Sequence, residues 1–230
     1  MITVENGAKE VAYRALVESR KACQLCTELV NPSACEGGTF DCDEIGAWSA
    51  WQGNLDAPIL VVGQDWGDVG WFVRESGKST STSVTNKTLI ELLHSVGFDI
   101  PLARNSSGRG ALFFTNAILC LKPGGAQGRV QHEWFQNCGG RFLRPLIELV
   151  RPKVVVGLGE RAYATVLSSY GLKPGPFSGA VEAREPVQLS GDIAAFAVYH
   201  CGARIQNTHR KLESQLRDWK RIAAFLARAG

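Results

Sequence analysis

The chain has 230 residues, of which 45% are hydrophobic and 20% are charged, and its formal net charge is +3. This composition is typical of a globular protein and excludes disorder as the dominant state. The longest apolar runs, 57–63 and 193–199, are too short to span a bilayer, and residues 1–21 lack the apolar core of a signal peptide. We therefore expect one intracellular, cytoplasmic domain over residues 1–230. The small positive charge permits a nucleic-acid partner only if the basic side chains cluster.

The cysteines are the most informative part of the composition. Their number is odd and no secretory signal precedes them, so a disulfide framework is disfavoured and metal-bound thiolates in a reducing compartment are favoured. A loop rich in Cys, Pro and Gly extends from Cys23 to about residue 43. The seven cysteines are Cys23, Cys26, Cys35, Cys42, Cys120, Cys138 and Cys201.

Short apolar segments alternate with helical patterns along the chain. Such alternation indicates parallel βαβ units with both faces of the sheet covered. The predicted fold is therefore α/β, a three-layer α/β/α sandwich around a four-stranded, mainly parallel sheet. Strands are predicted over 58–63, 111–119, 153–157 and 193–199, and helices over 7–22, 85–96, 131–150 (which Gly139 and Gly140 can interrupt), 161–170 and 208–227.

Polar side chains follow the predicted strands at the points where the strands end. Asp65 follows the first strand, Asn116 the second and His200 the fourth. Ligands of open parallel sheets bind outside the carboxyl ends of the strands. A carboxylate, an amide and an imidazole are therefore expected at the rim where chemistry takes place.

These strand ends resemble the motifs of the uracil-DNA glycosylase superfamily, over roughly Ala22–Arg221. Each motif alone is weak, but four occur in the right order. They are Gly63-Gln64-Asp65, similar to a Gly-Gln-Asp-Pro-Tyr motif; Thr115-Asn116 with Cys120, similar to the Thr-Asn-x-x-x-Cys of the iron–sulfur class; Val156–Gly159 with Ala162, similar to its third-strand turn; and Tyr199-His200, similar to the catalytic histidine loop.

The departures from the family pattern indicate a divergent member. Trp66 and Gly67 stand where the first motif has Pro-Tyr, and Cys201-Gly202 stands where Pro-Ser usually follows the histidine. The iron–sulfur class has a glutamate at the position of Gln64. The family's tyrosine blocks the methyl group of thymine, so thymine exclusion must arise elsewhere or be weaker here.

The resemblance implies a DNA-repair hydrolase of base excision repair that flips uracil out of DNA and leaves an abasic site. Asp65 would stabilise the oxocarbenium-like sugar and orient water, with Asp68 as the reserve carboxylate, and His200 would donate a hydrogen bond to uracil O2. One alternative is a glycosylase for another deaminated base, such as hypoxanthine. Another is a non-catalytic, metal-bearing protein that binds nucleic acid.

Further residues are assigned by the same resemblance. Asn116 would read O4 and N3 of uracil, with Gln64 beside it, and Trp71 or Phe72 would stack on the base, Phe72 being favoured. The uracil-containing DNA would be bound by a chain expected to be a monomer. Its phosphates would contact Arg204, Arg210 and Lys211.

Two partitions of the cysteines remain open, as does the alternative that they hold no metal. The local set Cys23, Cys26, Cys35 and Cys42 could build a zinc site. The distributed set looks like the four ligands of the [4Fe-4S] cluster in the iron–sulfur class, with a structural role because the chemistry transfers no electron. That set is Cys23, Cys26, Cys120 and Cys138.

Overall fold

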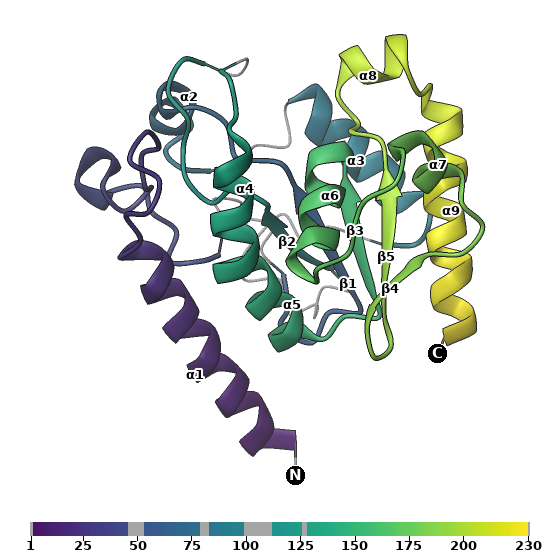
Figure 1. Cartoon of the computed structure of the whole chain (residues 1–230), viewed down its shortest axis with the longest axis horizontal. Helices are drawn as coiled ribbons and strands as arrows, with labels where there is room; N and C mark the ends of the chain where they lie inside the picture. The colour runs from purple at the N-terminus through teal and green to yellow at the C-terminus, as the bar shows by residue number, and fades with distance from the viewer. Residues whose placement is uncertain (1, 46–52, 79–82, 99–111, 126–127, 230) are drawn as a thin grey trace.

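The computed structural model describes residues 2–45, 53–78, 83–98, 112–125 and 128–229 (Figure 1). A five-stranded sheet runs through its centre in the order β2-β1-β3-β5-β4, and only β4 is antiparallel to its neighbour among the described pairs. The strands are β1 (Ile59–Gly63), β2 (Leu112–Asn116), β3 (Val154–Leu158), β4 (Val187–Ser190) and β5 (Ile193–Val198).

Helices cover both faces of this sheet, which confirms the predicted three-layer α/β/α arrangement (Figure 1). α1, α4, α5, α6 and α7 pack on one face, and α3 and α9 pack on the other. Their bounds are α1 (Ile2–Lys21), α2 (Val69–Arg74), α3 (Val84–His94), α4 (His132–Cys138), α5 (Arg144–Val150), α6 (Glu160–Ser169), α7 (Phe177–Glu182), α8 (Ala203–Thr208) and α9 (Leu212–Ala229).

The central strands are buried on both faces, as their uninterrupted apolar sequences predict. In β1, Leu60 and Val62 join one hydrophobic cluster, and Ile59 and Val61 join the other. Successive side chains of a strand point to opposite faces, so each face receives every second residue. Both clusters are closed by helices, which is why a strand without a polar side chain is stable here.

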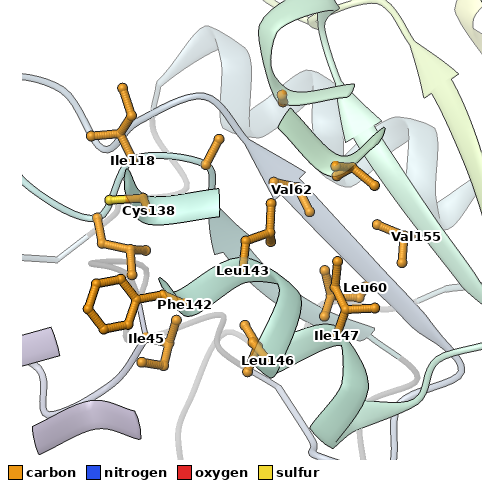
Figure 2. Close-up of a cluster of buried hydrophobic side chains, with 14 of the residues drawn as sticks. Ile45, Leu60, Val62, Ile118, Cys138, Phe142, Leu143, Leu146, Ile147 and Val155 are labelled. Carbon is orange, nitrogen blue, oxygen red and sulfur yellow. The ribbon is translucent and has the colours of Figure 1, made fainter. Parts of the chain in front are cut away.

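The helical segment after β2 is broken at its middle, where Gly139 and Gly140 were expected to interrupt it. A π-helical turn, Gly139–Leu143, joins α4 to α5. At Gly139 a Cβ would lie 3.1 Å from the Thr165 methyl group of α6, so glycine allows the two helices to approach closely. In Figure 2, Leu143 and Ile147 lie toward Val62 and Leu60 of the sheet, whereas Phe142 lies beside Ile45.

The structure differs from the predicted elements in several places. The sheet has a fifth strand, β4, whose mostly exposed sequence Val-Gln-Leu-Ser has no apolar run to reveal it. The predicted helix over 208–227 corresponds to α9, which begins only at Leu212. The short helices α2, α7 and α8 were not predicted. No helix among the described residues is long and apolar enough to cross a membrane.

The strand order creates a switch point beside β1. The chain leaves β1 to form β2 on one side and returns to form β3 on the other side. A crevice at the carboxyl ends of the strands is expected there. That end of the sheet carries the loops after β1, β2, β3 and β5, and α8 follows the arrowhead of β5 (Figure 1).

Candidate active site

A cleft of about 690 Å³ lies at the carboxyl ends of β1, β2, β3 and β5. It therefore occupies the place that the topology predicts, and its size is typical of small-ligand sites. Asp65, Asn116 and His200 all line it, so the structure brings together the three strand-end residues that the sequence singled out. Its lining also includes Gln64, Trp66, Trp71, Lys122, Gly159, Glu160, Arg161, Phe177, Tyr199, Arg204 and His209.

Asn116 presents an unsatisfied amide to this cleft. The residue is 2% exposed, and within the described residues neither its Nδ2 nor its Oδ1 has a hydrogen-bond partner. A Cβ on Gly63, its neighbour across the β1–β2 register, would lie 2.4 Å from Asn116 Oδ1, so glycine makes room for this side chain. Leaving a buried polar group unpaired costs about 1–3 kcal/mol. A ligand that carries both a hydrogen-bond donor and an acceptor would satisfy both polar atoms of this amide.

His200 follows β5 and is held as a neutral hydrogen-bond donor. The Gly202 N–H donates to His200 Nδ1 at 3.0 Å. Because Nδ1 accepts this bond, the proton of the neutral ring is assigned to Nε2. Burial lowers the pKa of His200 below its ordinary value, although the charge of Asp65 opposes the shift. The ring is therefore neutral at pH 7, with Nε2–H as its donor.

Asp65 lies in the loop after β1 and has two polar partners. Gln64 Nε2 donates to Asp65 Oδ2 at 2.6 Å, and Lys122 Nζ lies 3.2 Å from the same oxygen. The Asp65 and Lys122 side chains are each 6% exposed, so this is a buried ion pair. Asp68, the reserve carboxylate, instead caps α2: its Oδ1 accepts from the Trp71 N–H at 3.0 Å.

The loops that carry Asp65 and Asn116 are tied together beyond the strands. The Ala117 N–H donates to Gly63 O at 2.8 Å, and the Ile118 N–H donates to Gln64 O at 2.9 Å. These bonds continue the β1–β2 ladder past its last pair. They fix the carboxylate and the amide relative to each other before any ligand arrives.

The turn after β3 packs α6 closely against the sheet. A Cβ on Gly157 would lie 2.5 Å from Tyr163 Cα, so only glycine permits this contact. Gly159 has a φ of 95° and its N–H donates to Val198 O at 2.7 Å. A Cβ on Gly159 would lie 3.6 Å from His200 Cβ. The start of α6 therefore lies beside His200 at the cleft.

The aromatic assignments are only partly supported. Trp71 lines the cleft together with Trp66, and their ring centroids are 5.1 Å apart. Phe72, the favoured stacking residue, is 1% exposed and packs in a cluster with Trp66 and Cys35 rather than in the lining. Neighbouring positions on α2 differ by about 100° around the helix axis, so Trp71 and Phe72 face different surroundings.

The three residues predicted to contact phosphates have different surroundings in the structure. Arg204 is exposed and lines the cleft, and Lys211 is exposed outside the lining. The Arg210 guanidinium is already engaged: it donates to the buried Asp218 at 2.8 and 3.1 Å and to Glu182 at 3.3 Å. Arg210 thus joins α9 to α7 through these carboxylates, and its contact with DNA stays a prediction.

The four cysteines of the distributed partition line one cavity of about 430 Å³ at the base of the Cys-rich loop. Cys23 and Cys26 come from that loop, Cys120 follows β2, and Cys138 ends α4. Burial raises the pKa of Cys120 to about 12, and the three neighbouring thiols add to the shift.

The other cysteines lie elsewhere. Cys35 packs with Trp66 and Phe72, burial raises the pKa of Cys42 to about 12, and Cys201 Sγ lies 3.4 Å from Thr85 O. Cys35 and Cys42 are absent from the cavity lining, which disfavours the local zinc set. Across the described ranges, no three His, Cys, Asp or Glu side chains gather closely enough to hold one metal ion.

The sequence comparisons agree with this geometry. A family model of the uracil DNA glycosylase superfamily matches residues 50–224. A type-5 uracil-DNA glycosylase of Pyrobaculum aerophilum is 28% identical to this chain over 188 residues, which cover 77% of this chain and 78% of that protein. The family match spans most of the chain, including the cleft residues that follow all four parallel strands. The chain therefore belongs to the uracil-DNA glycosylase superfamily, and its enzyme class is that of the uracil-DNA glycosylases.

Proposed function

We propose that this chain hydrolyses the N-glycosidic bond of uracil in DNA and leaves an abasic site. The observation that carries the proposal is the buried, unpaired amide of Asn116 in a cleft that also holds a carboxylate and a neutral imidazole donor. The cleft lies inside the region matched by the superfamily. The relative from Pyrobaculum aerophilum is named as a uracil-DNA glycosylase, which supports the same substrate.

Bond cleavage would separate charge between the sugar and the leaving base. Asp65 would stabilise the oxocarbenium-like sugar and orient the attacking water, while His200 Nε2–H would donate to uracil O2 as negative charge develops there. Asn116 Nδ2 would donate to O4 and its Oδ1 would accept from N3–H. Cytosine presents the opposite pattern at these atoms and would be rejected.

The base would have to leave the DNA stack before it reaches these residues. Unstacking costs a few kcal/mol, and aromatic stacking in the pocket would offset part of that cost. Trp71 is now the better candidate for this contact, with Trp66 beside it. Arg204 at the rim, and Lys211 outside it, are the proposed phosphate contacts of a chain acting as a monomer.

The assay uses end-labelled oligonucleotides that contain uracil, hypoxanthine, cytosine or a thymine mismatch, treated with alkali to cleave abasic sites. The wild-type chain is expected to cleave the uracil strand. Asn116→Asp should lower that rate by about 10–10²-fold, because the donor to O4 becomes a carboxylate oxygen. The variant should also have a lower ratio of the uracil cleavage rate to the cytosine cleavage rate.

Asn54→Asp is the matched control, since Asn54 precedes β1 at the opposite end of the sheet and its Oδ1 accepts from the Asp56 N–H within a local turn. Cleavage of the hypoxanthine strand alone would move the proposal to that base. Binding without cleavage of any strand would contradict a glycosylase and favour a binding protein.

We further propose that Cys23, Cys26, Cys120 and Cys138 hold a [4Fe-4S] cluster. The donor set fits: four thiols from three segments line one cavity, as for a group wider than one ion. A bound cluster would supply no step of the hydrolysis. These thiolates would join the Cys-rich loop to the loop after β2 and to α4.

Cys120→Ala is expected to lose the brown colour and the absorbance at about 400 nm that such clusters give. Iron content per chain and the midpoint of thermal unfolding should both fall. Cys35→Ala should keep the colour and the iron, because its thiol lies in another cluster of side chains. A colourless wild-type chain purified without oxygen, or iron lost from Cys35→Ala but not Cys120→Ala, would refute the assignment.

A further inference from the structure

Lys122 lines the cleft and is almost completely buried. It comes two residues after Cys120 and is 5% exposed. Its N–H donates to Gly67 O at 3.1 Å, and its carbonyl accepts from the Val69 N–H at 3.4 Å. The backbone of Lys122 is thus bonded on both sides to the loop that carries Asp65.

The side chain continues this connection inside the cleft. Lys122 Nζ and Gln64 Nε2 both reach Asp65 Oδ2, at 3.2 and 2.6 Å. Two donors on Oδ2 restrain the rotation of the carboxylate. The bonds are charge-assisted and buried, which makes them directional and strong.

A buried ion pair usually contributes little to the net stability of a fold. Removing two charges from water costs several kcal/mol per ion, and apolar residues of similar size often replace such pairs without loss. Here the pair lines the cleft, and its carboxylate is the one proposed to act on the sugar. The lysine is also too buried, at 6% side-chain exposure, to be an ordinary phosphate contact.

We propose that Lys122 is a positioning residue for the reaction. The inference rests on the proposed function, because it assigns Lys122 to the same carboxylate. Lys122 holds Asp65 in place, with Gln64 as its second support, so that the carboxylate faces the sugar and the attacking water. It acts through Asp65 and has no contact of its own with the reacting atoms.

The test is a double-mutant cycle measured by single-turnover cleavage of a uracil-containing oligonucleotide. Lys122→Met should lower the rate at saturating enzyme by about 10–10²-fold, because a misplaced group loses about this much. The dissociation constant for DNA should change less than about threefold, and Lys122→Arg should recover part of the rate. In an Asp65→Asn background, Lys122→Met should cost less than about threefold more.

Lys220→Met, an exposed lysine on α9, is the matched control and should change neither constant. Thermal unfolding of each variant identifies any that fail to fold, and the double variant keeps the cycle informative because it removes both charges together. Equal losses in both backgrounds would show that Lys122 acts independently of Asp65, and a loss confined to DNA affinity would make it a phosphate contact. Either result overturns this inference alone, whereas an inactive wild-type chain overturns the proposed function as well.

Discussion

Asp65→Asn is expected to slow uracil excision on the order of 10²–10³-fold while DNA binding persists. The carboxylate is the only acidic group proposed to face the developing positive charge on the sugar, and asparagine has nearly the same shape without the charge. Asn would still offer an amide oxygen to Gln64 and Lys122. Single-turnover rates and gel-shift affinities measured on the same oligonucleotide separate the chemical step from binding.

Asp68→Asn is the control, because Asp68 caps α2 and asparagine caps helices about as well. Its rate should stay near that of the wild-type chain. Asp65→Asn also leaves the buried Lys122 without its counterion, and breaking such a pair costs about 3–5 kcal/mol. Rates must therefore be compared below the unfolding temperature of the variant. Equal rates for Asp65→Asn and the wild-type chain would mean that another group stabilises the sugar.

The sequence predicted the parts of the fold that depend on local apolar pattern. The strands β1, β2, β3 and β5 are runs of apolar residues long enough to be recognised, and parallel βαβ units follow from their alternation with helices. β4 could not be found this way, because an edge strand paired only with β5 needs no buried side chains. Its pairing is decided by the turn at residues 191–192, which joins it to β5.

The site was predictable where position along the chain determines position in space. Asp65, Asn116 and His200 follow strands of one parallel sheet, so the strand ends gather them at one edge. The direction of a side chain was not predictable: Phe72 turns into a buried cluster and Arg210 is paired with Asp218, eight residues later. Such pairings depend on tertiary packing rather than on spacing.

His200→Ala is expected to lower the cleavage rate by about 10²–10³-fold, the usual cost of removing one donor at a developing anion. His200→Gln should lose less, because its amide also provides a neutral donor of similar reach. The pH dependence of the rate distinguishes a neutral histidine donor from a protonated one. A neutral donor needs no proton from solution, so the wild-type rate should persist below the ordinary pKa of histidine and fall only as the buried ring is protonated.

The same pKa shift makes a prediction about stability. Because burial lowers the pKa of His200, the unfolded chain binds a proton on this ring over a pH range in which the folded chain does not. Stability therefore falls as pH decreases from the ordinary histidine pKa toward the lowered one, and this contribution levels off below it. His200→Gln should remove this part of the stability loss at low pH, as measured by thermal unfolding between about pH 7 and pH 5.

The cleavage rate tests the protonation of the same ring independently. A wild-type rate that rises on acidification would require a protonated imidazole. It would contradict the hydrogen bond from Gly202 as the feature that sets the ring's protonation.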